Sequence, residues 1–255
     1  MNGRALLWRA ASILVGVGFI ALWQWVADQR LVSPVFLPGP DRAWASLVRG
    51  FTTGDLGVKL AGTVERMLWG WLIASLVGIA LGAAIGSSAR LRAYVAPTLE
   101  FLRPLPASAI IPVAIALMGL SEPMVLTVIA FGSLWPVLLA TVHGFAAVEP
   151  RLYEVSRVLG LSRAATIFKI ALPSASPDIL AGMRLSITVA LILAVVGEML
   201  AGRDGVGHWI LLSARSFRAP DLYAGVIVLG ALGYASALLL ALVERQALGW
   251  RARAR

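Results

Sequence analysis

Long apolar runs recur along this chain, and they constrain its fold more than any other feature. Each run is long enough for a helix to cross the roughly 30 Å of hydrocarbon in a bilayer. The 255 residues are 59% hydrophobic and 14% charged, whereas a soluble domain usually carries about 25% charged residues. The pattern predicts an all-α, polytopic membrane helix bundle that forms one transmembrane domain, residues 1–255. About six spans are expected, at residues 6–27, 60–86, 93–120, 124–148, 177–200 and 221–243, and residues 60–243 hold the five-span core.

Basic residues at the two ends of the chain indicate its orientation. Lys and Arg concentrate on the cytoplasmic side of membrane proteins, and an even number of spans puts both termini on one side. We therefore expect both termini in the cytoplasm. The first run is too long for a signal peptide and ends in Trp23, Trp25 and Asp28 rather than in a cleavage site, so we expect it to remain as a span. The terminal basic residues are Arg4, Arg9, Arg245, Arg251, Arg253 and Arg255.

Charge and residue types exclude several classes of function. The net charge is +9, but the basic residues lie in short loops and at the ends, which favours contact with anionic lipid headgroups over nucleic acid. The chain has no cysteine, so disulfides, thiolate metal sites and iron–sulfur clusters are excluded. His143 and His208 lie far apart, without the spacing of metal ligands.

Two charged segments are too short to span a membrane. Residues 41–53 place apolar side chains at helical spacing after Asp41, a plausible N-cap. They predict an interfacial helix on the outer surface. Residues 206–217 predict a second helix of this kind.

Small residues follow one another at four-residue steps in the second expected span. They are Gly70, Ala74, Gly78, Gly82 and Gly86. On a helix they share one face, where small side chains let another helix approach closely. We expect a packing seam rather than a ligand site.

The third expected span is rich in proline, with Pro97, Pro104, Pro106 and Pro112. Each proline removes a backbone donor and disfavours regular helix. Irregular backbone at membrane depth survives where it is buried in protein or lines a water-filled cavity. Two interpretations stay open: the segment lines a pathway, or three of the prolines shape a cytoplasmic mouth and Pro112 alone kinks the span.

No sequence motif for catalysis is present. A chain that hydrolyses ATP needs a phosphate-binding loop in which lysine follows glycine, and neither Lys59 nor Lys169 does so. Ionisable residues within the spans, Arg66, Arg184 and Glu198 among them, are costly in lipid. They either pair within the bundle or contact a transported solute, and the sequence leaves both interpretations open.

Residues 150–173 form a polar, basic, amphipathic loop between the fourth and fifth spans. Glu154, Arg157, Val158, Leu161 and Ala165 can share one side of a short helix. Gly160 interrupts it and offers a tight turn or a close backbone approach. Leu172 and Pro173 are expected to end the segment before the fifth span begins. The result would be two short helices along the membrane surface; a solvated connector is the alternative.

The loop resembles the EAA motif of permease subunits in binding-protein-dependent ABC transporters. That pattern is E-A-A, three residues, G, nine residues, then I-x-L-P, and this chain matches it at Glu154, Gly160, Ile170, Leu172 and Pro173. It departs at Val155-Ser156, where the family has two alanines. Two further stretches, LRPLPASAIIPVAIALMGLSE and AGMRLSITVALILAVVGEMLAGRDGVGHWI, are similar to the sulfonate, nitrate and taurine branch. Met118 replaces the aromatic residue usual in the first of them.

The resemblance implies the type I ABC importer fold and a permease that is not an enzyme. It further implies a homodimer in the bacterial inner membrane, with two cytoplasmic ATPase subunits that use ATP and an extracytoplasmic solute-binding protein. No cofactor would be bound by this chain. Residues 150–173 would be the cytoplasmic coupling loop. By resemblance the ATPase-coupling residues would be Glu154, Ser156, Arg157, Leu159, Gly160, Leu161, Ser162, Ile170 and Pro173, and the candidate pathway residues are Pro112, Met118, Arg184 and Glu198.

A small anionic solute, such as a sulfonate, nitrate, taurine or a vitamin precursor, is the expected cargo. A stand-alone channel or ion-coupled carrier is the alternative, which would place ionisable groups near the midplane without needing an ATPase. An intramembrane enzyme would need polar side chains that converge at one depth, and the sequence does not show them.

Overall fold

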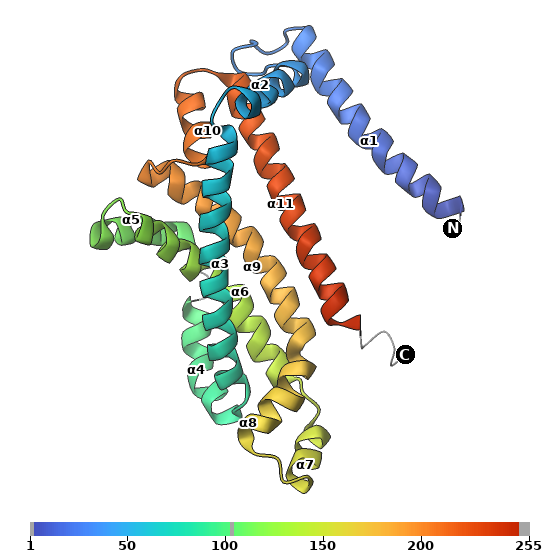
Figure 1. Ribbon diagram of the computed structural model, residues 1–255, viewed down its shortest axis with the longest axis vertical. Coiled ribbons are helices and arrows are strands. Elements are labelled where there is room, and N and C mark those ends of the chain that lie inside the picture. The colour runs from blue at the N-terminus through green and yellow to red at the C-terminus, as the bar shows by residue number, and fades with distance from the viewer. Residues whose placement is uncertain (1–2, 103–104, 250–255) are drawn as a thin grey trace.

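Three long helices form the centre of the computed structural model, which describes residues 3–102 and 105–249. The helices are α3 (Leu56–Gly86), α6 (Glu122–Ala146) and α9 (Leu172–Ala201), and they lie side by side along the long axis of the molecule (Figure 1). Buried apolar side chains from all three form the main core. The all-α prediction is confirmed over the described ranges, which contain no strand.

The closest approach of α3 and α6 follows the predicted stripe of small residues. A Cβ atom on Gly82 would lie 2.5 Å from the Cβ atom of Thr141, and one on Gly86 would lie 2.6 Å from the Cβ atom of Phe145. Neither gap admits a methyl group without displacement of α6, so the packing seam is confirmed. In lipid, van der Waals packing of this kind is a main source of helix association.

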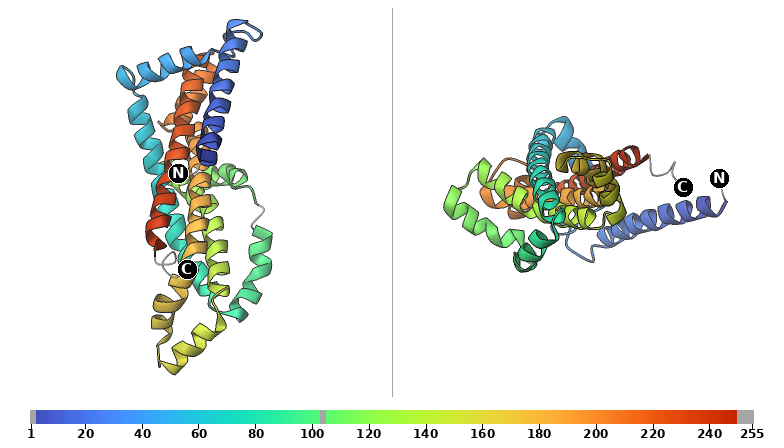
Figure 2. Two further views of the ribbon diagram at one scale, coloured as in Figure 1. Left: turned by 90° about the vertical axis from the view of Figure 1, so that its right-hand side faces the viewer. Right: turned by 90° about the horizontal axis from the view of Figure 1, so that it is seen from below.

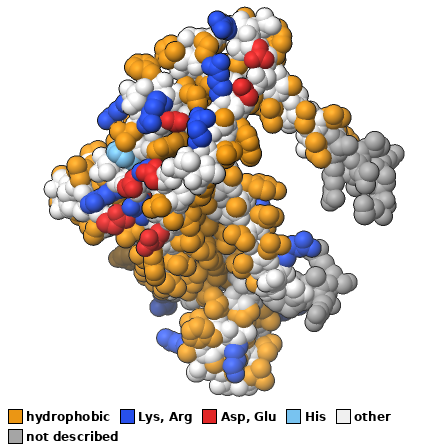
Figure 3. All heavy atoms as spheres, turned by 45° about the horizontal axis from the view of Figure 1, so that its top comes forward, with side chains coloured by type: hydrophobic (Ala, Val, Ile, Leu, Met, Phe, Trp, Pro, Cys, Tyr) orange, Lys and Arg blue, Asp and Glu red, His pale blue; other side chains and the backbone are white. Residues whose placement is uncertain are grey.

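Short helices lie at the two ends of the bundle. α2 (Pro40–Thr52) and α10 (Val206–Arg215) lie at one end, and α7 (Pro150–Val158) lies at the other (Figures 1 and 2). We call the end with α2 and α10 the α10 end, and the end with α7 the elbow end. α2 and α10 match the two short helices expected from the sequence. Figure 3 shows charged side chains gathered toward the α10 end and apolar side chains over the middle of the bundle.

The third expected span, residues 93–120, is not one continuous helix, as its prolines predicted. The segment is divided between α4 (Ala89–Leu102) and α5 (Ala107–Met118), whose axes differ by 87°. Over the described residues, five helical segments are each long and apolar enough to cross a membrane, and the bent pair could supply a sixth.

Only some of the prolines in this segment interrupt helix. Pro106 has extended backbone and caps the start of α5, a place where the missing N–H of proline does no harm. Pro97 and Pro112 lie inside α4 and α5 without ending either helix. Pro104 lies outside the described residues.

The helix of the fifth expected span begins well before Pro173. α8 (Arg163–Thr166) and the π turn η1 (Ile167–Ala171) continue directly into α9, so that 39 residues form one helical segment. The expectation that Leu172 and Pro173 end the preceding segment was wrong. The N–H of Leu172 bonds to the carbonyl five residues earlier, and this wider π spacing accommodates a proline that has no N–H to donate.

The remaining long helices are α1 (Gly3–Asp28) and α11 (Ala219–Ala247), which match the first and sixth expected spans. α11 packs against α2, α9 and α10, whereas α1 meets α2 and, through Trp23 against Tyr223, the start of α11, and otherwise extends away from the bundle (Figure 1). Its apolar side chains are exposed: Phe19, for example, is 70% exposed. Both helices have one end at the α10 end and extend from there in the direction of the elbow end, α11 farther than α1 (Figure 1).

Candidate functional site

The predicted coupling loop, residues 150–173, folds as an elbow of two helices joined at Gly160. The N–H of Leu161 donates to the carbonyl of Ser156 (2.9 Å), and the N–H of Gly160 donates to that of Arg157 (3.0 Å). These two bonds form a Schellman motif, which ends α7 and needs a left-handed residue after the cap. Gly160 supplies it with φ 64°. Because nothing lies within 4 Å of a Cβ atom built on Gly160, its backbone conformation rather than a close contact within this chain explains the glycine.

The second arm of the elbow starts at Ser162. Its Oγ accepts a bond from the N–H of Ala165 (3.2 Å) and so caps α8. Ile170 and Ala171 then pack against Phe145 of α6 and Ala175 of α9. The second arm is therefore anchored on the bundle and continuous with α9.

The faces of α7 differ in chemistry. Ser156 is buried against the bundle, and its hydroxyl donates to the carbonyl of Tyr153 (2.7 Å). Partial burial of Tyr153 raises the pKa of its hydroxyl. Beside Ser156 the helix and its cap carry exposed apolar side chains at Leu152 (38%), Val155 (50%), Val158 (87%) and Leu159 (66%). We call these four residues the apolar ridge.

A hollow of about 820 Å³ lies between the elbow and the turn that joins α3 to α4. Ser87 and Ser88 line it from the turn. The elbow contributes Tyr153, Glu154, Ser156, Arg157, Leu161, Arg163 and Thr166, among others. Four predicted coupling residues (Glu154, Ser156, Arg157 and Leu161) thus line this hollow, while Leu159 belongs to the apolar ridge.

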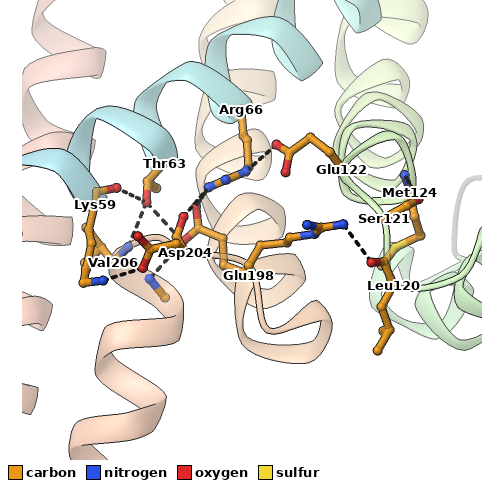
Figure 4. Close-up of polar contacts among 12 residues, drawn as sticks. Lys59, Thr63, Arg66, Leu120, Ser121, Glu122, Met124, Glu198, Asp204 and Val206 are labelled. Atoms are coloured by element: carbon orange, nitrogen blue, oxygen red, sulfur yellow. Dashed lines mark hydrogen bonds and ion pairs between the residues drawn. The ribbon is translucent and has the colours of Figure 1, made fainter.

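Ionic side chains converge at the α10 end, around Glu198 (Figure 4). Glu198 is 0% exposed. Its carboxylate accepts bonds from the Thr63 hydroxyl (3.0 Å), the Arg66 guanidinium (3.0 Å) and the N–H of Gly207 (2.9 Å). A charged group without water needs such partners, and here α3 and the start of α10 supply them.

Arg66 connects this carboxylate to two other parts of the chain. Its Nε lies 2.5 Å from Oε1 of Glu122 at the start of α6, and its Nη1 donates to the carbonyl of Asp204 (2.8 Å). Lys59 also pairs with the carboxylate of Asp204. We call Lys59, Thr63, Arg66, Glu122, Glu198 and Asp204 the ion cluster; it joins α3, α6, α9 and the loop before α10.

The four candidate pathway residues lie in different surroundings. Glu198 belongs to the ion cluster, and its three bonds leave little capacity for a solute. Pro112 and Met118 are exposed on α5, and Arg184 is exposed on α9. The structure therefore joins Glu198 to Arg66, as the pairing interpretation expected, and does not gather the four residues at one place.

Sequence reasoning missed several partners in the ion cluster. Glu122 begins α6 and Asp204 lies in the loop before α10, and at such places a carboxylate carries no sequence signal of pairing. Thr63 is separated from Glu198 by 135 positions along the chain. The adjacent charges at Glu65 and Arg66 were the available signal, and of these two Arg66 faces the cluster.

A bundle of membrane-crossing helices with a polar, exposed elbow at one end is the architecture of a membrane transport subunit. The chain belongs to the family of binding-protein-dependent transport system inner membrane components, whose model matches residues 74–248. The matched part includes α6, the elbow, α9 and α10. The protein is a multipass permease of an ABC transport system and not an enzyme, and its family functions with ATPase and binding-protein partners.

Known relatives agree with the branch indicated by the sequence. The taurine transport system permease protein TauC of Escherichia coli is 29% identical over 98% of this chain and 95% of the relative. The nitrate import permease protein NrtB of Synechocystis is 33% identical over 76% of this chain and 71% of the relative. The fold is shared with the inward-facing MetNI methionine ABC transporter at a TM-score of 0.66 and 15% identity, over 75% of this chain and 95% of that chain.

Proposed function

We propose that two copies of this chain form the translocation pathway of an ATP-driven importer for a small solute that carries an anionic group. Sulfonates, nitrate, taurine and anionic vitamin precursors are the candidate cargoes. The relatives named for taurine and nitrate support this class. The elbow would dock on a cytoplasmic ATPase, and a solute-binding protein would deliver cargo at the α10 end.

The apolar ridge on α7 carries the proposal. Its residues are exposed although a helix end carrying Arg151, Glu154 and Arg157 belongs in water rather than in lipid. Leu152, Val155 and Leu159 follow the i, i+3, i+7 spacing of a helix that inserts into a partner's groove. An exposed apolar stripe with a charged border is typical of a docking surface.

The continuous segment Arg163–Ala201 supports the mechanism. ATP binding and hydrolysis would move the docked ATPase subunits. A displacement of the elbow would then pass along α9 without an intervening flexible loop, because helical backbone bonds connect the two. The elbow's anchors on α6 would carry the same displacement to the second central helix.

Membrane orientation follows from the same proposal. The elbow end faces the cytoplasm together with both termini, and the α10 end faces outward with α2 and α10 at the outer interface. The directions of α1 and α11 agree with termini on the elbow side (Figure 1). The elbow side also carries Arg90, Arg92, Arg151, Arg157, Arg163 and Lys169, which fits the excess of basic residues in cytoplasmic loops.

Substitution of Gly160 tests the docking role. Val at φ 64° is strained by about 1–2 kcal/mol or more, because its branched side chain meets its own backbone. Asn tolerates this conformation, and a Cβ atom there has open space. We expect Gly160→Val to insert normally and lose uptake and binding-protein-stimulated ATP hydrolysis, and Gly160→Asn to keep both. The measurement uses proteoliposomes with the cognate ATPase and solute-binding protein.

Val158 gives an independent test, because it is 87% exposed and contributes little to folding. Val158→Asp should abolish copurification of the ATPase, and Val158→Leu should retain it. Normal uptake in Gly160→Val and Val158→Asp would contradict the coupling role. Uptake by this chain alone, driven by an ion gradient, would instead support the secondary-carrier alternative.

A further inference from the structure

Arg184 lies at the middle of the bundle, deeper than its place in the sequence indicates. Two hydrogen bonds bracket it. Trp71 Nε1 donates to the carbonyl of Met183 (3.1 Å), and Ser186 Oγ donates to the carbonyl of Ser133 (2.6 Å). Trp71 is the central residue of α3, about 22 Å from each helix end at 1.5 Å per residue. Ser133 is one residue from the centre of α6. Arg184 therefore lies near half-depth.

The side chain of Arg184 is exposed on an open stripe of α9. The stripe continues through Leu185 (66% exposed), Thr188 and Ile192 (56% exposed). The opposite face of the helix, with Ser186, Ile187 and Ala190, is buried against the bundle. Within residues 3–102 and 105–249, no hydrogen bond or ion pair reaches the Arg184 guanidinium.

An unpaired guanidinium at half-depth needs a polar environment. Placing Arg at the centre of a membrane helix is costly even by insertion scales. Snorkelling relieves this cost near helix ends, and Arg184 is far from both. The open stripe must therefore meet water, an anion or a carboxylate from another chain.

We propose that Arg184, with Thr188 one turn away, forms an anion-recognition station in the translocation pathway. The inference rests on the proposed function, because it takes the open stripe of α9 as pathway wall. The planar guanidinium offers paired N–H donors that match two oxygens of a sulfonate, nitrate or carboxylate group. The Thr188 hydroxyl would add a neutral donor. In a two-fold dimer each copy would contribute one such station at the same depth.

The rival partner is Glu100 of a second copy. Glu100 is exposed on α4, about 17 Å along that helix from its start near the elbow end at 1.5 Å per residue. An ion pair between copies would also satisfy Arg184. Anion recognition is favoured because the stripe pairs the charge with the exposed hydroxyl of Thr188.

The absence of cysteine from this chain permits a direct test. Arg184→Cys would introduce its sole thiol, which can react with small water-soluble thiosulfonates that attach either a trimethylammonium or a sulfonate group. Leu76→Cys, on an exposed face of α3 near the same depth, is the matched control. The assay is ATP-dependent uptake of taurine, methanesulfonate, nitrate and bicarbonate by the reconstituted transporter, together with labelling of this chain on gels.

We expect Arg184→Cys to lower uptake about 10- to 100-fold, the range for one hydrogen bond to a charged group. Both reagents should label Arg184→Cys and leave Leu76→Cys unlabelled, and the cationic reagent alone should restore uptake. Arg184→Lys should fall between wild type and Arg184→Cys, and it tests the role even where the cysteine variant is poorly produced.

Other outcomes overturn the inference. Failure of both reagents to label Arg184→Cys would show that the stripe is dry. Equal restoration by the two reagents, or undiminished uptake, would remove the charge requirement. In one such outcome, Glu100→Gln lowers uptake as much as Arg184→Cys does, and the charge-exchanged double variant Arg184→Glu with Glu100→Arg restores uptake. That pair of results would show that Arg184 pairs with Glu100 of the second copy. The labelling experiment does not depend on transport, so it tests this inference separately from the proposed function. The proposed function would be contradicted if the wild-type transporter took up none of these solutes in the presence of ATP and the binding protein.

Discussion

The two ends of α9 differ in which kind of side chain is buried and which is exposed. At the α10 end, Glu198 is completely buried and every bond it makes goes to another part of the same chain. At the elbow end, the apolar ridge leaves Val158 and Leu159 mostly exposed. A charged side chain is buried at one end, and apolar side chains are exposed at the other. The first is complete within this chain, and the second is left for a partner.

This difference indicates which end can move relative to the bundle. A buried ion cluster fixes the register of the helices it joins but adds little net stability, because desolvation of the charges offsets their attraction. Loss of the buried Glu198 is costly, since Thr63, Arg66 and the N–H of Gly207 all lose an acceptor that water does not replace. The α10 end of α9 should therefore hold its position on α3. The elbow end is held by apolar packing and helix caps, which tolerate small displacements more readily.

The strongest test of the comparison is Glu198→Ala. It leaves Arg66, Thr63 and the N–H of Gly207 without their shared acceptor, and breaking a buried pair in this way costs about 3–5 kcal/mol. We expect a drop of that size in the free energy of unfolding, measured by denaturation in bicelles. Glu65→Ala is the control, because Glu65 is exposed on the same helix as Arg66. A similar change in both variants would show that the cluster does not fix the α10 end.

Local sequence signals predicted the elbow better than the ion cluster. The turn at Gly160 follows from a glycine after an amphipathic helix, and the two bonds that require it lie within six residues. The ion cluster depends on pairs such as Arg66 with Glu198, which are 132 positions apart. Which charges meet there is decided by helix packing, and a single sequence does not encode that packing in any short pattern.

Two prolines that stand out in the sequence have opposite effects on the helices around them. Pro106 begins α5 after a bend of 87°, in the segment where the prolines predicted irregular backbone. Pro173 lies within a continuous helix, where we expected an end, because the π turn before it removes the need for its N–H. The residue type signals a backbone constraint in both cases. The neighbouring hydrogen bonds decide between a bend and a continuation.

Gly82→Ala tests whether the central helices α3 and α6 are more closely packed than the peripheral helix α1. The added methyl group would lie 2.5 Å from the Cβ atom of Thr141 and 2.9 Å from the carbonyl oxygen of Leu138, and overpacking of this kind costs about 1–3 kcal/mol. We expect a lower free energy of unfolding by that amount. Gly18→Ala on α1 is the control, since nothing lies within 4 Å of a Cβ atom there. An equal effect of the two substitutions would argue against the seam.

The smallest expected effect concerns the edge of the ion cluster, where Asp55 pairs with Lys59 (2.9 Å). The hydrogen bond from Lys59 lowers the pKa of the Asp55 carboxyl below its ordinary value of 3.8. A carboxyl whose folded-state pKa is lowered stabilises the fold above its unfolded pKa and loses that effect as pH falls through the folded pKa. Asp55→Asn should therefore reduce stability slightly at pH well above 3.8, and the difference from wild type should vanish at lower pH. The effect is small because Asp55 is largely exposed and Lys59 keeps its second partner, Asp204.

The control for this prediction is a Lys59→Met background, in which Asp55→Asn should leave the stability unchanged. A stability difference between Asp55→Asn and wild type that stays the same below the folded-state pKa would contradict the prediction. It would mean that Asp55 stabilises the start of α3 by a contact that does not depend on its charge, and that Asp55 is no part of the ion cluster.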